Sequence, residues 1–294
     1  MNQLVHEPVL AKEVLQVLGP KEGDTYLDTT AGYGGHAKQV ISRIGKDGLA
    51  ILVDRDQNAI QSLSKSFSDN PIVQILHEDF YASSKELQKK GQKFDMILAD
   101  LGVSSPHLNS ARRGFSFMKE GPLDMRMDQR QPLTAADIAN SYSQPQLTEI
   151  LRKYGEVRNA PKMAKVIAIN RPYKTTTDLA NVIARATPGH SKIHPATKVF
   201  QAFRIAVNQE LSLLEAALPV WVDLLADGGR LAVISFHSLE DRRVKQFFTD
   251  RAGGLYDSEL KILTKKPITG SKTEIVHNPR SRSAKLRAAV KIKT

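Results

Sequence analysis

The 294-residue sequence contains no cysteine, a single tryptophan and fewer acidic than basic side chains. Without cysteine, disulfide bonds, thiolate zinc sites and a cysteine nucleophile are excluded; no metal site is predicted. No apolar run approaches the roughly 20 residues that a membrane-spanning helix requires. Residues 1–7 also lack the basic and then apolar pattern of a signal peptide. These absences predict a cytoplasmic protein that does not enter a membrane.

The charge that is present is mainly positive. The 42 Lys and Arg residues outnumber the 31 Asp and Glu residues, which leaves a net charge of +11 and a pI near 9.7. A basic surface attracts phosphates and accelerates their arrival, so a nucleic acid partner is favoured. The alternative is that the charge serves solubility alone.

Short apolar runs alternate with segments of helical spacing through the first hundred residues. Alternation at this spacing is typical of a parallel sheet covered by helices on both faces. We therefore predict an α/β fold with strands ending at 27 and spanning 49–53, 72–76, 96–99 and 231–234, and with early helices at 36–44, 59–67 and 83–90.

Each of the first four predicted strands is followed by an acid, namely Asp28, Asp54, Asp79 and Asp100. Ligands of parallel sheets bind beyond the carboxyl ends of the strands. One acid at a strand end is usually a helix cap, but four in register indicate one crowded edge. After Asp28 the chain continues with Gly32, Gly34 and Gly35, a Gly-x-Gly-Gly pattern that predicts either a ligand-cradling turn or only a tight connection.

The pattern changes after Asp100. Residues 102–128 show no sustained period, although Phe115, Phe117 and three methionines argue against disorder, and from Thr134 the spacing is helical only. We predict a helical substrate-recognition domain at 106–195, inserted into a discontinuous domain formed by 1–105 and 196–294. A long helix is predicted from Pro195 to Leu218. The tail from Lys261 is rich in Lys and Arg and offers little core material.

The spacing of Gly34 and Asp54 suits a ligand that carries a ribose, because an acid about 20 residues after the glycine turn accepts hydrogen bonds from the ribose diol. Nicotinamide dinucleotides and S-adenosylmethionine both fit. Three features favour S-adenosylmethionine: Asp28 could hold an amino group, the third glycine that pyrophosphate binding needs is missing, and Asp79-Phe80 offers an acceptor and a ring for adenine. Phe80 could equally be a core aromatic.

Long characteristic strings run nearly from end to end of the chain. They are His6-Glu7-Pro8-Val9-Leu10, Gly34-Gly35-His36, Asp54-Arg55-Asp56, Asp100-Leu101-Gly102-Val103-Ser104-Ser105-Pro106, Arg113-Gly114-Phe115-Ser116-Phe117, Gly121-Pro122-Leu123-Asp124-Met125-Arg126-Met127, His194-Pro195-Ala196-Thr197, Arg204-Ile205-x-Val207-Asn208-x-Glu210-Leu211, Ser235-Phe236-His237-Ser238-Leu239-Glu240-Asp241-Arg242 and Asn278-Pro279-Arg280-x-Arg282-Ser283. With these strings the chain closely resembles a known family, the bacterial MraW/RsmH family of 16S ribosomal RNA cytosine-N4 methyltransferases.

The resemblance implies a Rossmann-like class I S-adenosylmethionine-dependent methyltransferase fold with an inserted all-helical domain that helps to hold RNA. It implies methylation of the exocyclic N4 amine of a cytidine in 16S ribosomal RNA, with the small ribosomal subunit as partner. His107 departs from the family, which usually has glutamine there, but either side chain can exchange one hydrogen bond. The implied cofactor contacts are Gly34, Gly35, His36, Asp54, Phe80, Asp100 and His107.

Two residues are candidates for a catalytic role. Asp100, with the carbonyls of the 101–105 turn, could accept hydrogen bonds from the target amine, or Asp100 could bind only the cofactor. His237 could accept a proton after transfer, although a histidine after a strand is more often structural. Phe115, Phe117 and Met125 could receive the unstacked base or could form a small core.

The basic candidates for phosphate contact are Arg112, Arg113, Arg126, Lys192, Lys198, Arg204, Arg280, Arg282, Lys285 and Arg287. For any one of them a solvated surface charge is the alternative. Two other functions stay open at this stage: a non-catalytic RNA-binding or ribosome assembly factor, and an NAD-dependent oxidoreductase. A DNA substrate is disfavoured by the resemblance alone. Monomer and homodimer are equally compatible with the sequence.

Overall fold

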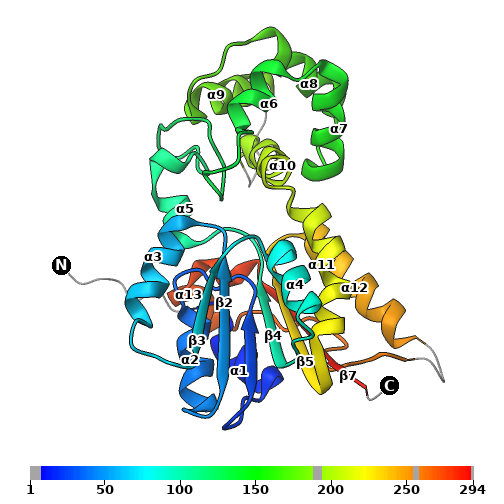
Figure 1. Ribbon diagram of the computed structural model, residues 1–294. Helices are drawn as coiled ribbons and strands as arrows, with labels where there is room; N and C mark the ends of the chain where they lie inside the picture. The colour runs from blue at the N-terminus through cyan, green and yellow to red at the C-terminus, as the bar shows by residue number, and fades with distance from the viewer. Residues whose placement is uncertain (1–7, 188–193, 254–257, 293–294) are drawn as a thin grey trace. The chain divides into compact units, whose positions relative to one another are not determined.

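The structure, a computed structural model, describes residues 8–187, 194–253 and 258–292 (Figure 1). The chain divides by its internal contacts into two compact units. We call residues 1–102 and 211–294 the sheet unit and residues 103–210 the helical unit.

The sheet unit is built on a seven-stranded sheet with the order β3-β2-β1-β4-β5-β7-β6. The pairs among the first five strands are parallel, whereas β7 runs antiparallel to both β5 and β6. The predicted α/β fold with a parallel core is confirmed. The strands are β1 (Thr25–Asp28), β2 (Leu49–Asp54), β3 (Val73–His77), β4 (Phe94–Asp100), β5 (Leu225–Ser235), β6 (Leu260–Ile262) and β7 (Lys285–Lys291).

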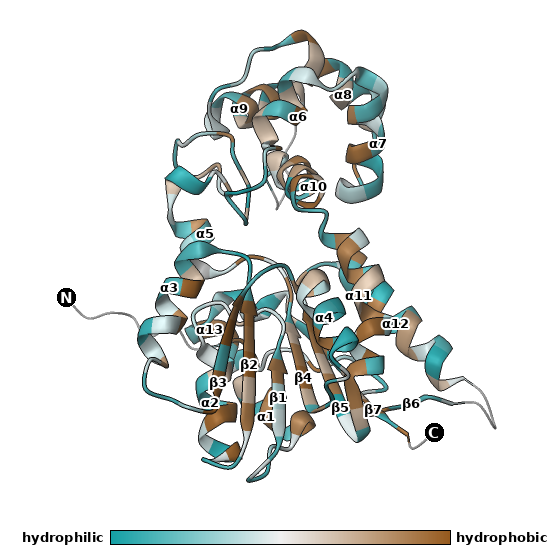
Figure 2. Ribbon diagram, viewed as in Figure 1, coloured by the Kyte–Doolittle hydropathy of each residue, from teal (hydrophilic) through white to brown (hydrophobic). Residues whose placement is uncertain are grey.

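An apolar core lies on each face of this sheet because successive strand side chains point in opposite directions. In β2, Ile51 and Val53 join one core, while Ala50 and Leu52 join the other. The strands β2 and β4 are accordingly apolar over most of their length (Figure 2). The helices of this unit are α1 (Ala11–Leu18), α2 (Gly35–Ile44), α3 (Gln57–Ser66), α4 (Phe80–Lys89), α11 (Glu210–Leu224), α12 (Ser238–Ala252) and α13 (Lys272–His277), followed by the 3₁₀ turn Pro279–Arg282.

The sequence predicted that the basic tail from Lys261 offers little core material, and this prediction is wrong. Leu286 and Ala288 of β7 are fully buried and belong to one core, and Ala289 belongs to the other. The Lys and Arg residues of this strand suggest a solvent-exposed tail, which is why the sequence did not indicate a strand. In the structure these cations pair with an acid of the same protein. Arg287 and Lys285 bind the Asp241 carboxylate of α12 at 2.7 and 3.1 Å.

The helical unit has its own apolar core, to which all the long helices and the preceding loop contribute. Its boundary differs from the predicted 106–195, since Phe200, Phe203 and Val207 of the last helix are part of this core. Its elements are α5 (Ser105–Asn109), the 3₁₀ turn Ala111–Arg113, α6 (Ala135–Ser141), α7 (Gln144–Gly155), α8 (Ala160–Ile169), α9 (Thr176–Ala186) and α10 (Ala196–Asn208).

The long helix predicted from Pro195 to Leu218 is in fact two helices, α10 and α11. Gln209 adopts the left-handed conformation, with φ of 50°, and its N–H closes α10 on the carbonyl of Ile205. Pro219 does not end a helix, because it lies inside α11. None of the helices in the described ranges combines the length and hydropathy that a bilayer crossing demands.

The loop between α5 and α6 is held by its own apolar side chains. Phe115 and Met125 are buried in the core of the helical unit, and Phe117 packs its ring edge-on against Phe200, with centroids 4.9 Å apart. Asn208 of α10 fixes the loop further, because its side chain accepts the Met127 N–H and donates to the Met125 carbonyl. This packing corresponds to the alternative in which these side chains form a core.

Candidate active site

The glycine turn after β1 is organised by Asp54, the last residue of β2. One Asp54 oxygen accepts the Gly32 N–H and the other accepts the Asp56 N–H, both at 2.8 Å. The Ala31 N–H donates to the Val53 carbonyl and fixes the same turn. Asp54 therefore has a local structural role, and its predicted role as a ribose acceptor remains a proposal.

Gly34 and Gly35 occupy positions where a side chain would be crowded by its neighbours. Gly34 has φ of 80°, and a Cβ there would lie 3.1 Å from Leu63 and Phe67. A Cβ on Gly35, the first residue of α2, would lie 3.2 Å from Pro8. The turn thus leads directly into the N-terminal end of α2, where positive partial charge and free N–H groups gather.

Asp28, the last residue of β1, is only 1% exposed. Its carboxylate accepts hydrogen bonds from the Tyr26 hydroxyl at 2.8 Å and from the Thr30 N–H at 3.3 Å. Its pKa is raised to about 7, mainly by burial and to a smaller extent by the charge of Asp54, whereas the two hydrogen bonds oppose this rise. The geometry assigns Asp28 to support of the turn, and not to the direct grip on an amino group that the sequence suggested.

Asp100, the last residue of β4, lies at the same edge because β1 and β4 are parallel neighbours. Its backbone N–H donates to the Thr30 hydroxyl at 2.6 Å, and its Oδ2 lies 3.7 Å from Nε2 of the buried His36. Its Oδ1 has no hydrogen-bond partner in the described part of the chain. Burial, then the charges of Asp28 and Glu240, raise its pKa to about 8.

The side chain of Asp100 nevertheless keeps 26% of its surface exposed. The side chain is therefore in contact with solvent, although partial burial and the neighbouring acids disfavour its ionised form. A carboxylate that is partly desolvated, close to another acid and short of a donor favours a positively charged ligand. This combination is the main chemical feature of the edge.

Phe80, at the start of α4, is 7% exposed and belongs to the core. Its ring packs against Trp221, with centroids 5.5 Å apart and an angle of 57°. Trp221 donates its indole N–H to the Ser84 hydroxyl, which donates to the Phe80 carbonyl. Phe80 is thus the core aromatic of the alternative interpretation, and only a small part of its ring remains for a ligand.

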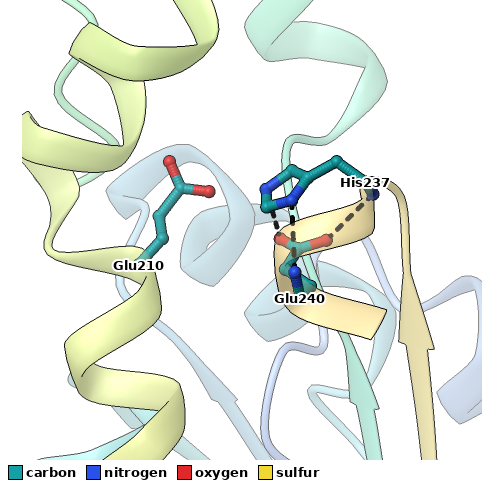
Figure 3. A group of neighbouring side chains, drawn as sticks. All are labelled: Glu210, His237 and Glu240. Atoms are coloured by element: carbon teal, nitrogen blue, oxygen red, sulfur yellow. Dashed lines mark hydrogen bonds and ion pairs between the residues drawn. The ribbon is translucent and has the colours of Figure 1, made fainter. Parts of the chain in front are cut away.

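His237 and Glu240 form a capping box at the N-terminus of α12 (Figure 3). His237 Nδ1 accepts the Glu240 N–H, so the proton of the neutral ring is on Nε2, which lies 3.2 Å from Glu240 Oε1. Glu240 in turn accepts the Phe236 N–H at 2.8 Å. With Nδ1 acting as a cap, the geometry favours the structural alternative for His237.

His107 lies in the helical unit, in α5, and is buried. Its Nδ1 accepts the Ser104 N–H at 3.2 Å, and its ring packs against Phe115 at 4.9 Å. It acts as a cap of its own helix. The other predicted contacts belong to the sheet unit and follow the carboxyl ends of β1, β2, β3 and β4; they are Gly34, Gly35, His36, Asp54, Phe80 and Asp100.

Residues 3–292 match the MraW methylase family. The chain belongs to the MraW methylase family. It is 47% identical to a ribosomal RNA small subunit methyltransferase H from Cyanothece sp., over 99% of this chain and 96% of the relative. It is 42% identical to the protein of the same name from Halothermothrix orenii, over 98% and 99% of the two chains. Among solved structures, it resembles an O-methyltransferase from Thermotoga maritima with a TM-score of 0.45 and 10% identity, over 100% of this chain and 70% of that one.

This methylase of the MraW family uses S-adenosylmethionine, and the observed residues fit that group. S-adenosylmethionine carries a sulfonium and an ammonium, and the edge offers Asp100 with an unsatisfied buried oxygen. Residues that could hold it are Gly34, Gly35 and His36 at the start of α2, Asp54, the exposed part of Phe80, and Asp100. A bound cation would lower the raised pKa of Asp100.

The sequence did not reveal three supporting residues of this methylase. Thr30 joins the glycine turn to Asp100, Trp221 supports Phe80, and Glu240 holds His237. Glu240 could have been found, because an acid three residues after a polar first residue is the pattern of a capping box. The partners of Thr30 and Trp221 are 70 and 137 residues away, so no local signal exists.

The predicted phosphate contacts are mostly engaged within the protein. Arg113 donates to two backbone carbonyls, and Arg126 and Arg204 pair with Asp124 and Glu210. Lys285 and Arg287 share Asp241, as described above. Arg112 and Arg282 are exposed, while Lys198 and Arg280 are partly buried. Lys192 lies outside the described residues.

Proposed function

We propose that this protein transfers a methyl group from S-adenosylmethionine to the exocyclic N4 amine of a cytidine in the 16S ribosomal RNA of the small ribosomal subunit. Its near full-length similarity to small subunit methyltransferases supports the substrate. The observation that carries the chemistry is the partly exposed, unsatisfied carboxyl of Asp100 beside the glycine turn. With that substrate, the protein would act in the cytoplasm.

The cytosine amine is a poor nucleophile because its lone pair is delocalised into the ring. When bound, S-adenosylmethionine supplies a methyl group on a positively charged sulfur. The protein must hold the amine in line, and a well-aligned geometry can remove several kcal/mol from a barrier. An acceptor for the amine hydrogens also returns the lone pair to nitrogen.

Asp100 supplies that acceptor in the proposed mechanism. Its buried Oδ1 accepts no hydrogen bond from the described residues, and its backbone is fixed by the bond from its N–H to Thr30 and by the Leu101 N–H, which donates to the Ile234 carbonyl at 2.9 Å. In its ionised form Asp100 stabilises the positive charge that develops on the amine and can take up the proton that is released. His36 Nε2 lies 3.7 Å from the Asp100 Oδ2, which is beyond hydrogen-bond distance.

Two other functions were weighed against this one. An oxidoreductase that binds a nicotinamide dinucleotide lacks support, because Ala37 occupies the position of the last glycine in the Gly-x-Gly-x-x-Gly pattern that pyrophosphate binding needs. A ribosome assembly factor that binds RNA without turnover would keep the same fold. It would not need an unsatisfied carboxyl at the sheet edge, which costs stability.

Undermethylated small subunits, incubated with the protein and methyl-labelled S-adenosylmethionine, test the proposal. We expect label in 16S ribosomal RNA and, after digestion to nucleosides, N4-methylcytidine by mass spectrometry. Binding to the subunits without incorporation would instead indicate an assembly factor. Label in another nucleoside would overturn the assigned substrate atom.

A further inference from the structure

The net positive charge is concentrated in the helical unit. Residues 103–210 contain 16 Lys and Arg against 8 Asp and Glu, so they carry +8 of the total +11. Several cations of this unit are used internally. Arg204 of α10 pairs with Glu210. Arg113 donates to the carbonyls of Arg126 and Met127, and Arg126 and Arg130 pair with Asp124 and Asp128, so these three arginines hold the loop between α5 and α6.

A second group of cations differs from these. Within the 14 residues from 152 to 165, which form the junction of α7 and α8, the only acid is Glu156. The two helices pack against each other, so the cations at their junction share one region of the surface. We call this group the α7–α8 basic surface: Arg152, Lys153, Arg158, Lys162 and Lys165, all of which are exposed.

No member of the α7–α8 basic surface forms an ion pair with another residue in the described ranges. Lys153 Nζ lies 5.4 Å from the centre of the Tyr154 ring, a cation–π contact that brings no opposite charge to the surface. Unpaired like charges on one surface repel each other and give the folded protein no stability. A partner of opposite charge would remove that repulsion.

The helix dipole explains the positions of only some of these five cations. Arg152 and Lys153 occupy the last turn of α7, where cations complement the helix dipole. Lys162 lies in the first turn of α8, a turn without any acid, where a cation opposes the dipole. The side chains that α8 buries, Ala164 and Ile167, lie on a different face from Lys162 and Lys165. Lys162 and Lys165 therefore contribute neither to the apolar core nor to the capping of α8.

We propose that the α7–α8 basic surface binds the phosphate backbone of the substrate RNA outside the methylated nucleotide. The inference rests on the proposed function for the identity of the polyanion. Each cation that neutralises a phosphate releases a counterion, so affinity falls with salt and does so for any RNA sequence. The surface fixes where the RNA lies, whereas the carboxyl edge of the sheet determines which atom reacts.

The test is a variant with five substitutions, Arg152→Gln, Lys153→Gln, Arg158→Gln, Lys162→Gln and Lys165→Gln, in the full-length protein. Its dissociation constant for a protein-free fragment of 16S ribosomal RNA is measured over a range of salt concentrations. We expect affinity at least tenfold weaker at low salt. The dependence on salt should also be shallower, by about one in the logarithmic slope for each phosphate that the variant no longer neutralises.

A matched control is Lys89→Gln with Lys90→Gln at the end of α4. Both lysines are exposed, and they lie just before β4, at the sheet edge opposite to Asp100. This variant should bind RNA like the parent. Circular dichroism and calorimetric titration with S-adenosylmethionine should show that the five-substitution variant keeps its fold and its cofactor affinity.

An unchanged RNA affinity and salt slope in the five-substitution variant would overturn the proposal. So would unchanged binding to free RNA together with lost binding to assembled subunits, since the surface would then contact a ribosomal protein. Failure of the proposed function itself looks different: the parent protein would bind RNA but transfer no methyl group. The two results are separable because binding is measured without turnover.

Discussion

The two units of this protein place their charges in opposite ways. In the sheet unit the charges to which we assign a function are acids, held at one edge of the sheet where Asp28 is buried and Asp100 is partly desolvated, both with raised pKa values. In the helical unit the charges in excess are cations, exposed and without an ion pair to any described residue at the junction of α7 and α8. A carboxylate partly withdrawn from water suits a cationic ligand, whereas exposed cations suit a polyanion.

The largest effect is expected from Asp100→Asn, which keeps the shape of the side chain but cannot ionise. Loss of the acceptor that stabilises the developing charge should lower kcat by about 10²- to 10³-fold, while RNA affinity stays that of the parent. Single-turnover methylation of small subunits measures the first, and filter binding the second. A kcat within about twofold of the parent would remove Asp100 from the chemistry.

The same variant tests the raised pKa. Because the ionised carboxylate is the active form, kcat/KM of the parent should rise with pH and level off above about 8. The stability effect has the opposite sign: an acid whose folded pKa lies above its unfolded value stabilises the protein at low pH, and this contribution is lost between about pH 4 and 8. Urea unfolding should show a smaller fall over this range for Asp100→Asn than for the parent.

Asp54→Ala should weaken binding of S-adenosylmethionine by about 1–3 kcal/mol, the loss expected for hydrogen bonds to a charged acceptor. RNA affinity should not change, which would separate the functions of the two units. Calorimetric titration gives the dissociation constant. Asp47→Ala removes an exposed acid between α2 and β2 and is the matched control. If Asp54→Ala bound the cofactor like this control, Asp54 would have no place in the site.

Asn208→Ala should act on the helical unit alone. The side chain satisfies the Met127 N–H and the carbonyls of Met125 and Arg204, all within 3 Å. Its removal leaves buried polar groups unpaired, so we expect a loss of about 1–3 kcal/mol in the free energy of unfolding. The exposed Asn170→Ala serves as control. Denaturant titration should show the loss, and unchanged cofactor affinity in native buffer would show that the sheet unit is unaffected.

The smallest effect is expected at His237. His237→Ala removes the cap of α12 and should cost about 1 kcal/mol of stability, whereas His237→Asn keeps an acceptor and should restore most of it. Both variants should retain kcat within a few-fold at saturating substrate. A drop in kcat of tenfold or more in His237→Asn, with its stability intact, would show that the histidine takes part in proton transfer after all.

Much of the sheet unit was predictable from local pattern. Apolar runs such as 49–53 and 96–99 must be buried, and their alternation with helical segments permits little other than a parallel sheet. The acids after these runs were correctly expected at one edge. Strand β7 was not predictable, because Lys285 and Arg287 made its segment resemble a solvated tail. Their partner Asp241 is more than 40 positions away in the sequence.

The helical character of the helical unit was predictable from the sequence, but the position of its C-terminal end was not. Its helices followed from their spacing, as at α6 and α7. Its end did not, since the break at Gln209 is marked by neither glycine nor proline. The phosphate contacts chosen from sequence were largely those that the structure uses internally. Sequence shows how many cations there are, but not which of them have an acid within reach.

By itself, the sequence determined the class of the fold, the edge at which the acids gather and the membership of the MraW family, because local spacing and motif strings carry that information. Only the tertiary structure decided the state of each charged group. Whether Asp28 supports a turn, His237 caps a helix or Lys162 remains unpaired depends on neighbours brought together by folding. The free energy of a charge is set by those neighbours and by the water they exclude.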